Sequence, residues 1–321
     1  MLLSDRHLKL FYTTVGSVVI VDSQNGLYQF NLDQGVREMQ YLTNNKSLVF
    51  LTFLILLTLI IVPFNWNIIK IHAYMMIRNL SKIHLDYVTR DFNELSNSNF
   101  IIKYKENKES ALLVAKTGSE ILQPVNRILG YNYKGTVPVI LYPTMEELNK
   151  SFGWEGDKSP MGVYWMGTIR ILAPEAWVEE DENQAVVFKK LGPMAHEYTH
   201  LVVDYKTNGN YTRWFTEGVA QYVEKKITGF TLVEPADEAK SNLYTFANLD
   251  KSFDEQVNQE LAYWQSLKAV EYIVDKHGEQ VINDLLDQLS RGQPFPEVFK
   301  IVVGEDLDKF ENNIKQYAKN K

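Results

Sequence analysis

The segment His196-Glu197-Tyr198-Thr199-His200 places the tightest limit on the fold, because both histidines can reach one metal ion only if the segment is helical. An α-helix has 3.6 residues per turn, so side chains four positions apart lie on the same face. Glu197, next to the first histidine, can accept a proton from water held at the same metal. The sequence therefore predicts a helix here, with a metal site on one face.

Glu217 completes the candidate ligand set. The 16 residues that separate it from His200 include Gly209 and Asn210, which allow the chain to reverse between two antiparallel helices. Two histidines and one carboxylate leave a fourth tetrahedral position for water, which is typical of catalytic zinc sites. We therefore expect Zn²⁺ as the cofactor, His196, His200 and Glu217 as its ligands, and Glu197 as the general base.

Two polar residues stand four positions beyond a candidate ligand on the same helix. Asp204 follows His200, and Gln221 follows Glu217. This spacing puts each of them beside its ligand, where a polar side chain can orient the ligand through a hydrogen bond. A role as an ordinary solvated surface residue is the alternative for both.

A long apolar run precedes this region. No charged residue lies between Lys46 and Lys70. A helix needs about 20 apolar residues to cross the hydrocarbon core of a membrane, and Trp66 suits the interface at the far end. The run predicts one transmembrane helix over residues 47–66 and a single-pass protein of the cell membrane. Positive charges flank both sides, so the expected extracytoplasmic catalytic domain rests on analogy with anchored enzymes.

The apolar run divides the chain into four predicted regions. Residues 1–46 contain two β-prone runs around Asn25-Gly26, which favours a short hairpin on the cytoplasmic side. Residues 67–99 are a juxtamembrane helix and linker, and residues 100–321 form the catalytic domain. The predicted fold class is α+β: a small mixed β-sheet with helices, followed by a helical zinc-binding subdomain and preceded by one transmembrane helix.

Several elements of the catalytic domain are predicted individually. Periodicity indicates strands at Phe100–Tyr104 and Val137–Tyr142, and a hairpin from Met161 to Leu172 that turns at Met166-Gly167. The metal-binding helix is expected over roughly Gln184–Tyr205.

The two motifs that carry the metal ligands resemble those of gluzincins, metallopeptidases in which two histidines of one helix and a glutamate of the next bind zinc. They read Met194-Ala195-His196-Glu197-Tyr198-Thr199-His200 and Trp214-Phe215-Thr216-Glu217-Gly218-Val219-Ala220-Gln221-Tyr222. More narrowly, residues 100–315 are similar to membrane-associated bacterial proteins of the peptidase MA-like family. The resemblance implies hydrolysis of a peptide or protein substrate. A clear aminopeptidase motif is missing, which favours an endopeptidase.

The resemblance also implies two finer features of the site. Tyr263 fits the tyrosine-bearing helix of the family, whose hydroxyl would stabilise the oxyanion beside the metal; a core aromatic is the alternative. Residues 162–172 would provide an edge strand that pairs with an extended substrate, and ordinary packing is the alternative there.

Composition excludes several other chemistries. The 321 residues include no cysteine, so thiol catalysis and cysteine-bound zinc are excluded. A net charge of −7 without a lysine or arginine cluster argues against nucleic-acid binding. Two other function classes stay open: a non-catalytic binding or regulatory membrane protein with the gluzincin fold, and an assembly protein whose N-terminal hairpin is the working part. Glu197 favours the enzyme over the first of these two classes.

Overall fold

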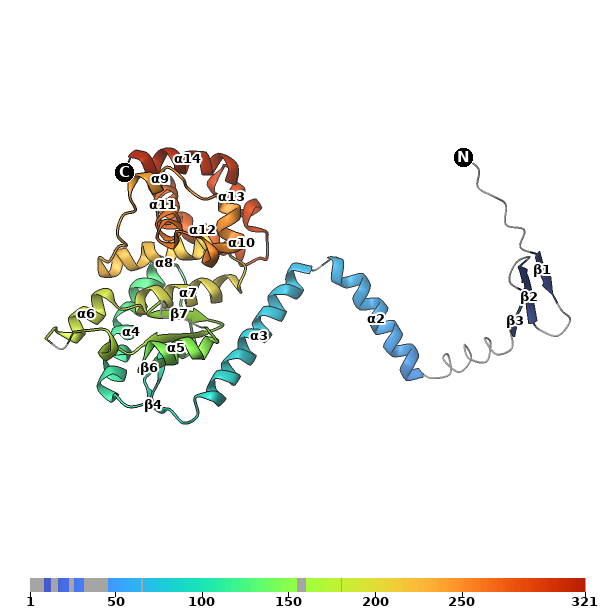
Figure 1. Cartoon of the computed structure of the whole chain (residues 1–321), viewed down its shortest axis with the longest axis horizontal. Helices are drawn as coiled ribbons and strands as arrows, with labels where there is room; N and C mark the ends of the chain where they lie inside the picture. The colour runs from blue at the N-terminus through green and yellow to red at the C-terminus, as the bar shows by residue number, and fades with distance from the viewer. Residues whose placement is uncertain are drawn as a thin grey trace. The chain divides into compact units, whose positions relative to one another are not determined.

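The protein divides into two compact units, Met1–Trp66 and Asn67–Lys321. Residues 67–99, which the sequence analysis set apart as a juxtamembrane helix and linker, lie in the same unit as residues 100–321. The computed structural model, shown in Figure 1, describes residues 9–12, 17–22, 26–31, 46–64, 66–154, 160–179 and 181–320.

The described residues of the first unit form a small antiparallel sheet and the helix α2 (Lys46–Phe64). Strands β1 (Lys9–Tyr12), β2 (Ser17–Asp22) and β3 (Gly26–Asn31) pair in the order β1-β2-β3. The expected hairpin is the β2–β3 pair, in which Val18 stands opposite Phe30. Asn25, which the sequence predicts in the turn of this hairpin, lies outside the described residues.

The predicted transmembrane helix at residues 47–66 is wrong. Among the residues that the structure describes, none of the helices combines the length and the apolar character that a bilayer crossing requires. Helix α2 (Lys46–Phe64) has 19 residues and begins with Lys46 and Ser47, so its apolar part falls short of the roughly 20 residues that a hydrocarbon core demands. The single-pass membrane localisation and the membrane partner depended on this helix and are withdrawn with it. The predicted fold class loses its transmembrane helix for the same reason, whereas its α+β part agrees with the structure.

The second unit is built on a five-stranded mixed sheet. Its order is β4-β5-β6-β8-β7, with β5, β6 and β8 parallel and the two edge strands antiparallel to their neighbours. The strands are β4 (Asn93–Ser96), β5 (Phe100–Tyr104), β6 (Val137–Tyr142), β7 (Gly162–Trp165) and β8 (Thr168–Leu172). This confirms the strands predicted at the positions of β5 and β6 and the predicted hairpin. At its turn, Met166 and Gly167 have φ values of 45° and 86°, the left-handed pair that a tight two-residue hairpin needs.

Helices cover the sheet and form the rest of this unit. Figure 1 shows α7 and α8 lying between the strands and the C-terminal helices, which are coloured orange to red. The helices are α3 (Trp66–Val88), α4 (Lys108–Ile128), α5 (Met145–Phe152), α6 (Gln184–Leu191), α7 (Met194–Thr207), α8 (Arg213–Thr228), α9 (Asp237–Lys240), α10 (Phe246–Ser252), α11 (Gln259–His277), α12 (Gln280–Leu289), α13 (Phe295–Val303) and α14 (Leu307–Asn320), with single 3₁₀ turns η1 (Pro174–Ala176) and η2 (Phe253–Glu255).

The metal-binding helix is shorter than the sequence predicts. The expected helix over Gln184–Tyr205 is two helices, α6 and α7, that break at Gly192-Pro193. Proline has no N–H to continue the helical hydrogen bonds. A Cβ at Gly192 would lie 2.3 Å from the Phe188 carbonyl oxygen, so the tight break also requires glycine at this position.

Helix α7 is held from several sides, which fixes the direction of its metal-facing side chains. It contacts α4, α8, α12 and β7, and Tyr198, Leu201 and Val202 are fully buried in the main core. Asn208 ends the helix in the left-handed conformation with φ 54°, and the chain reverses into α8. The expected pair of consecutive helices is confirmed.

Candidate metal centre

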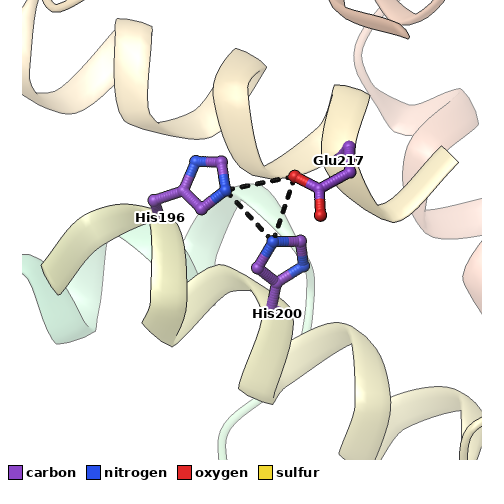
Figure 2. A group of neighbouring side chains, drawn as sticks. All are labelled: His196, His200 and Glu217. Atoms are coloured by element: carbon purple, nitrogen blue, oxygen red, sulfur yellow. Dashed lines mark hydrogen bonds and ion pairs between the residues drawn. The ribbon is translucent and has the colours of Figure 1, made fainter. Parts of the chain in front are cut away.

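His196, His200 and Glu217 converge on one point between α7 and α8 (Figure 2). The two imidazole Nε2 atoms lie 3.1 Å apart. Glu217 Oε2 lies 3.3 Å from Nε2 of His196 and 3.5 Å from Nε2 of His200. Three side chains from two helices thus present three ligand atoms to one small volume.

This triangle fits a tetrahedral zinc ion. Zinc binds imidazole nitrogen and carboxylate oxygen at about 2.0–2.2 Å, so two ligand atoms of a tetrahedron stand about 3.3–3.6 Å apart. The two edges to Glu217, 3.3 and 3.5 Å, lie within this range, and the edge between the two imidazoles, 3.1 Å, is slightly shorter. The donor set of two imidazoles and one carboxylate also matches zinc better than magnesium or calcium, which prefer oxygen ligands.

The outer nitrogen of each imidazole has an acceptor of its own. His196 Nδ1 lies 3.1 Å from Glu224 Oε2, and His200 Nδ1 lies 2.8 Å from Thr216 Oγ1. If each Nδ1–H donates to this oxygen, each Nε2 carries a lone pair, as a metal ligand must. Burial alone would lower the pKa of His196, but its hydrogen bonds to Glu217 and Glu224 raise this pKa well above its usual value, so a cation bound here would take the place of a proton.

Glu217 uses its two carboxylate oxygens differently. Oε2 faces the imidazoles, whereas Oε1 lies 2.8 Å from Nη1 of Arg213, one helical turn earlier on α8. Burial alone would raise the pKa of the Glu217 carboxyl, but Arg213 and the two histidines outweigh burial and hold this pKa well below its usual range. Glu217 is therefore an anion suited to a divalent cation.

Glu197 lies beside the ligands and under the edge strand. It is buried, and its Oε2 accepts a 2.5 Å hydrogen bond from the backbone N–H of Tyr164 on β7. Burial raises the pKa of Glu197, which moves the carboxylate towards the basicity that a general base needs. The close approach depends on Gly162, where a Cβ would lie 2.5 Å from Cβ of Pro193.

Tyr263 and Gln221 both lie where α11 meets α8. The nearby Glu217 carboxylate and burial raise the pKa of the Tyr263 phenol, so its hydroxyl keeps the proton that an oxyanion donor needs. Gln221 donates to the backbone carbonyls of Tyr263, at 2.8 Å, and of Glu217, at 3.3 Å. It therefore fixes the backbone of the ligand helix and not the ligand carboxylate.

Asp204 lies at the other end of α7 from Glu197. It is fully buried, and its carboxylate accepts hydrogen bonds from Tyr74, Arg78 and Tyr164. Its contacts join α3 and β7 to α7, whereas the sequence analysis expected it beside His200.

Four residues of this centre were missed by the sequence analysis: Tyr164, Arg213, Thr216 and Glu224. Arg213 precedes Glu217 by four positions and Glu224 follows it by seven, so helical periodicity carried a signal for both. Thr216 stands directly before Glu217, so helical spacing did not indicate that it would contact a ligand. The contact from Tyr164 to Glu197 joins residues 33 positions apart on different elements, and no local pattern predicts it.

Comparison with known proteins relates the chain to one protein family and to a curated relative. The family model of the peptidase MA superfamily matches residues 112–320. The chain is similar to the uncharacterized protein YhcO of Bacillus subtilis (strain 168), with 25% identity over 251 residues that cover 74% of each chain.

Two solved structures show a weaker likeness. The M1 zinc metallopeptidase from Deinococcus radiodurans is 13% identical with a TM-score of 0.36, over 70% of this chain and 50% of that one. A two-domain M1 zinc metallopeptidase mutant bound to L-arginine is 12% identical with a TM-score of 0.39, over 70% and 51%. The chain thus spans about half the length of these metallopeptidases. Because the family model covers most of its residues, the chain belongs to the peptidase MA superfamily.

Proposed function

We propose that this protein is a zinc-dependent peptidase that hydrolyses internal bonds of a peptide or protein substrate. The convergence of His196, His200 and Glu217 at tetrahedral spacing carries the proposal. Membership of the peptidase MA superfamily supports it.

The site residues would have three separate roles: metal binding, proton transfer and stabilisation of the oxyanion. His196, His200 and Glu217 would hold Zn²⁺, which when bound supplies a Lewis acid that makes water a stronger nucleophile at neutral pH. Glu197 takes the proton from the attacking water and returns it to the leaving amine. Tyr263, protonated and close to Glu217, would donate a hydrogen bond to the developing oxyanion.

The position of β7 supports an extended substrate. It is one of the two edge strands of the described five-stranded sheet and lies directly beside Glu197. An extended peptide can pair with such an edge on both sides of the bond to be cut, as an endopeptidase requires. Longer peptides should therefore be cleaved with lower KM than dipeptides, and a preference for the shortest peptides would contradict this part of the proposal.

The decisive experiment compares bound zinc and peptide cleavage for the full chain and three variants. We expect Glu197→Gln to keep its zinc and to lose cleavage by about 10²–10⁴-fold, since only the general base is removed. His200→Ala should lose both, whereas Glu182→Gln, an exposed carboxylate, should lose neither. A wild-type chain that binds no zinc, or a Glu197→Gln variant that cleaves normally, would overturn the proposal.

A further inference from the structure

Tyr164 connects two positions of the metal-binding helix. Its backbone N–H donates to Glu197 Oε2 at 2.5 Å, and its hydroxyl donates to Asp204 Oδ2 at 2.6 Å. Glu197 and Asp204 stand seven residues apart, two turns along α7. One residue of β7 thus fixes both the distance and the direction of this strand relative to α7.

The hydroxyl of Tyr164 also stabilises its own hairpin. It accepts a 2.9 Å hydrogen bond from the backbone N–H of Gly167 in the β7–β8 turn. Burial and the Asp204 carboxylate raise the pKa of the Tyr164 phenol well above its usual value, which favours the protonated hydroxyl that donates to Asp204.

Helix α3 balances the buried charge of Asp204. Arg78 Nη1 lies 2.7 Å from Asp204 Oδ2, and the two side chains are 5% and 0% exposed. Tyr74, one turn earlier, donates to the other carboxylate oxygen. The Arg78 guanidinium also lies over the ring of Tyr205, 3.7 Å from its centre.

Two glycines let α3 approach closely enough to make these contacts. A Cβ at Gly209 would lie 2.5 Å from the ring of Tyr74, and one at Gly167 would lie 2.9 Å from Cδ of Lys82. Both glycines have positive φ, at 78° and 86°. The docking of α3 is therefore fitted to the end of α7 and to the β7–β8 turn together.

A buried ion pair of this kind contributes more to geometry than to stability. The cost of removing both charges from water offsets much of their attraction, and an apolar pair of similar volume is often as stable. An apolar pair could not accept the hydrogen bond that the Tyr164 hydroxyl donates to Asp204. The charge on Asp204 is therefore best explained by the side chains that it orients.

We propose that Tyr164 is a positioning residue for Glu197, that Asp204 and Arg78 hold Tyr164 in place, and that α3 is thereby part of the catalytic apparatus. The catalytic consequence rests on the proposed peptidase function, but the structural coupling does not. Loss of Arg78 would leave the buried Asp204 carboxylate without its counter-charge and weaken the hold of Asp204 on Tyr164, so that the Tyr164 N–H shifts from Glu197 and the base loses its orientation. A misplacement of about 1 Å can cost 10²-fold in rate.

Hydrogen exchange of β7 tests the coupling without any assumption about activity. In the full chain, Arg78→Met and Tyr164→Phe should both speed amide exchange of residues 162–167 by roughly tenfold, because the strand opens locally more often. Arg78→Lys keeps the charge and should restore most of the protection. Leu80→Gln, on the exposed face of α3, is the matched control and should leave β7 unchanged.

Kinetics then test the catalytic consequence. We expect Tyr164→Phe and Arg78→Met to lower kcat by about tenfold, with bound zinc and the visible spectrum of the cobalt-substituted protein unchanged. A purely structural defect would instead reduce metal content and soluble yield, and Arg78→Lys would not restore kcat. If Arg78→Met does not fold, Tyr164→Phe, which loses one hydroxyl, still decides the matter.

The outcomes separate the two proposals. Unchanged exchange of β7 in Tyr164→Phe overturns the coupling, whatever the activity. Faster exchange with unchanged kcat overturns the positioning role. If the wild-type chain cleaves no peptide, the peptidase function fails while the exchange result still decides the coupling between α3 and β7.

Discussion

Arg213 shows how one side chain can control a ligand without touching the metal. It holds Oε1 of Glu217 through Nη1 and reaches Asp254 through Nη2, at 2.8 and 3.2 Å. Its backbone N–H also donates to Asp250. These contacts keep Oε2 of Glu217 turned towards the imidazoles, so the carboxylate would bind through one oxygen.

Loss of this guanidinium should weaken the metal site. We expect Arg213→Met to reduce zinc affinity roughly 10–100-fold, the usual cost of losing a group that orients a ligand. Competition with a chelator of known affinity measures the change. Lys225→Met alters an ion pair near the other end of the same helix and serves as the control; equal affinity in both variants would show that Arg213 has no orienting role.

The residues of the centre differ in how far the sequence predicts them. His196, Glu197, His200 and Glu217 were identified because helical spacing is a local property that can be read from one segment. Asp204 was expected beside His200 by the same spacing. In the structure its contacts come from α3 and β7, and those contacts depend on tertiary packing that spacing does not report.

At the scale of elements, Gly218 sets the distance between α8 and α11. A Cβ at this position would lie 2.2 Å from the Ser266 carbonyl oxygen and 2.7 Å from Cγ2 of Val270. Because Gly218 follows Glu217 directly, any separation of the two helices moves a candidate ligand. The glycine is required by close packing here and not by a special backbone angle.

Gly218→Ala should therefore damage both stability and metal binding. Overpacking of this kind costs about 1–3 kcal/mol of the free energy of unfolding, which lowers Tm by several degrees in a domain of this size. We expect weaker zinc binding in addition, because Glu217 is displaced. Lys226→Ala, at a partly exposed position of the same helix, is the control, and a Gly218→Ala variant with unchanged Tm would refute the packing argument.

Elements were predicted well where their pattern was complete within a few residues. The strands at Phe100–Tyr104 and Val137–Tyr142 have the predicted bounds. The break at Gly192-Pro193 was overlooked, because the apolar periodicity continues across it.

At the scale of the whole molecule, a metal ion would link two helices that carry much of the core. Contacts of α7 and α8 extend to the sheet and to α11, so a ligand that binds only the folded state should stabilise the entire second unit. Binding at 100 times the dissociation constant contributes about 2.7 kcal/mol.

We therefore expect chelation to lower Tm of the wild-type chain and added zinc to restore it. His200→Ala should show the lower Tm with or without zinc, since it lacks a ligand. Magnesium, which prefers six oxygen ligands, should not replace zinc in this assay. Differential scanning calorimetry at fixed protein concentration measures the effect; an identical zinc response in His200→Ala would place the ion elsewhere.

Prediction from the sequence was weakest in the N-terminal third of the chain. An uncharged apolar run predicts a membrane span from composition alone, whereas the helix that forms, Lys46–Phe64, is too short in its apolar part. In helix α3, Met76, Leu80 and Ile83 are exposed, while Arg78 and Leu85 are buried. Its apolar periodicity therefore does not mark the face that packs against the protein.

The pair formed by Arg78 and Asp204 restricts how this protein can diverge. The two residues stand 126 positions apart in the sequence. Mutation of either one to a neutral residue would leave the charge of the other buried without an opposite charge. Descendant sequences should therefore keep both charges or exchange both for neutral residues, and homologues that retain only one of the two should be rare.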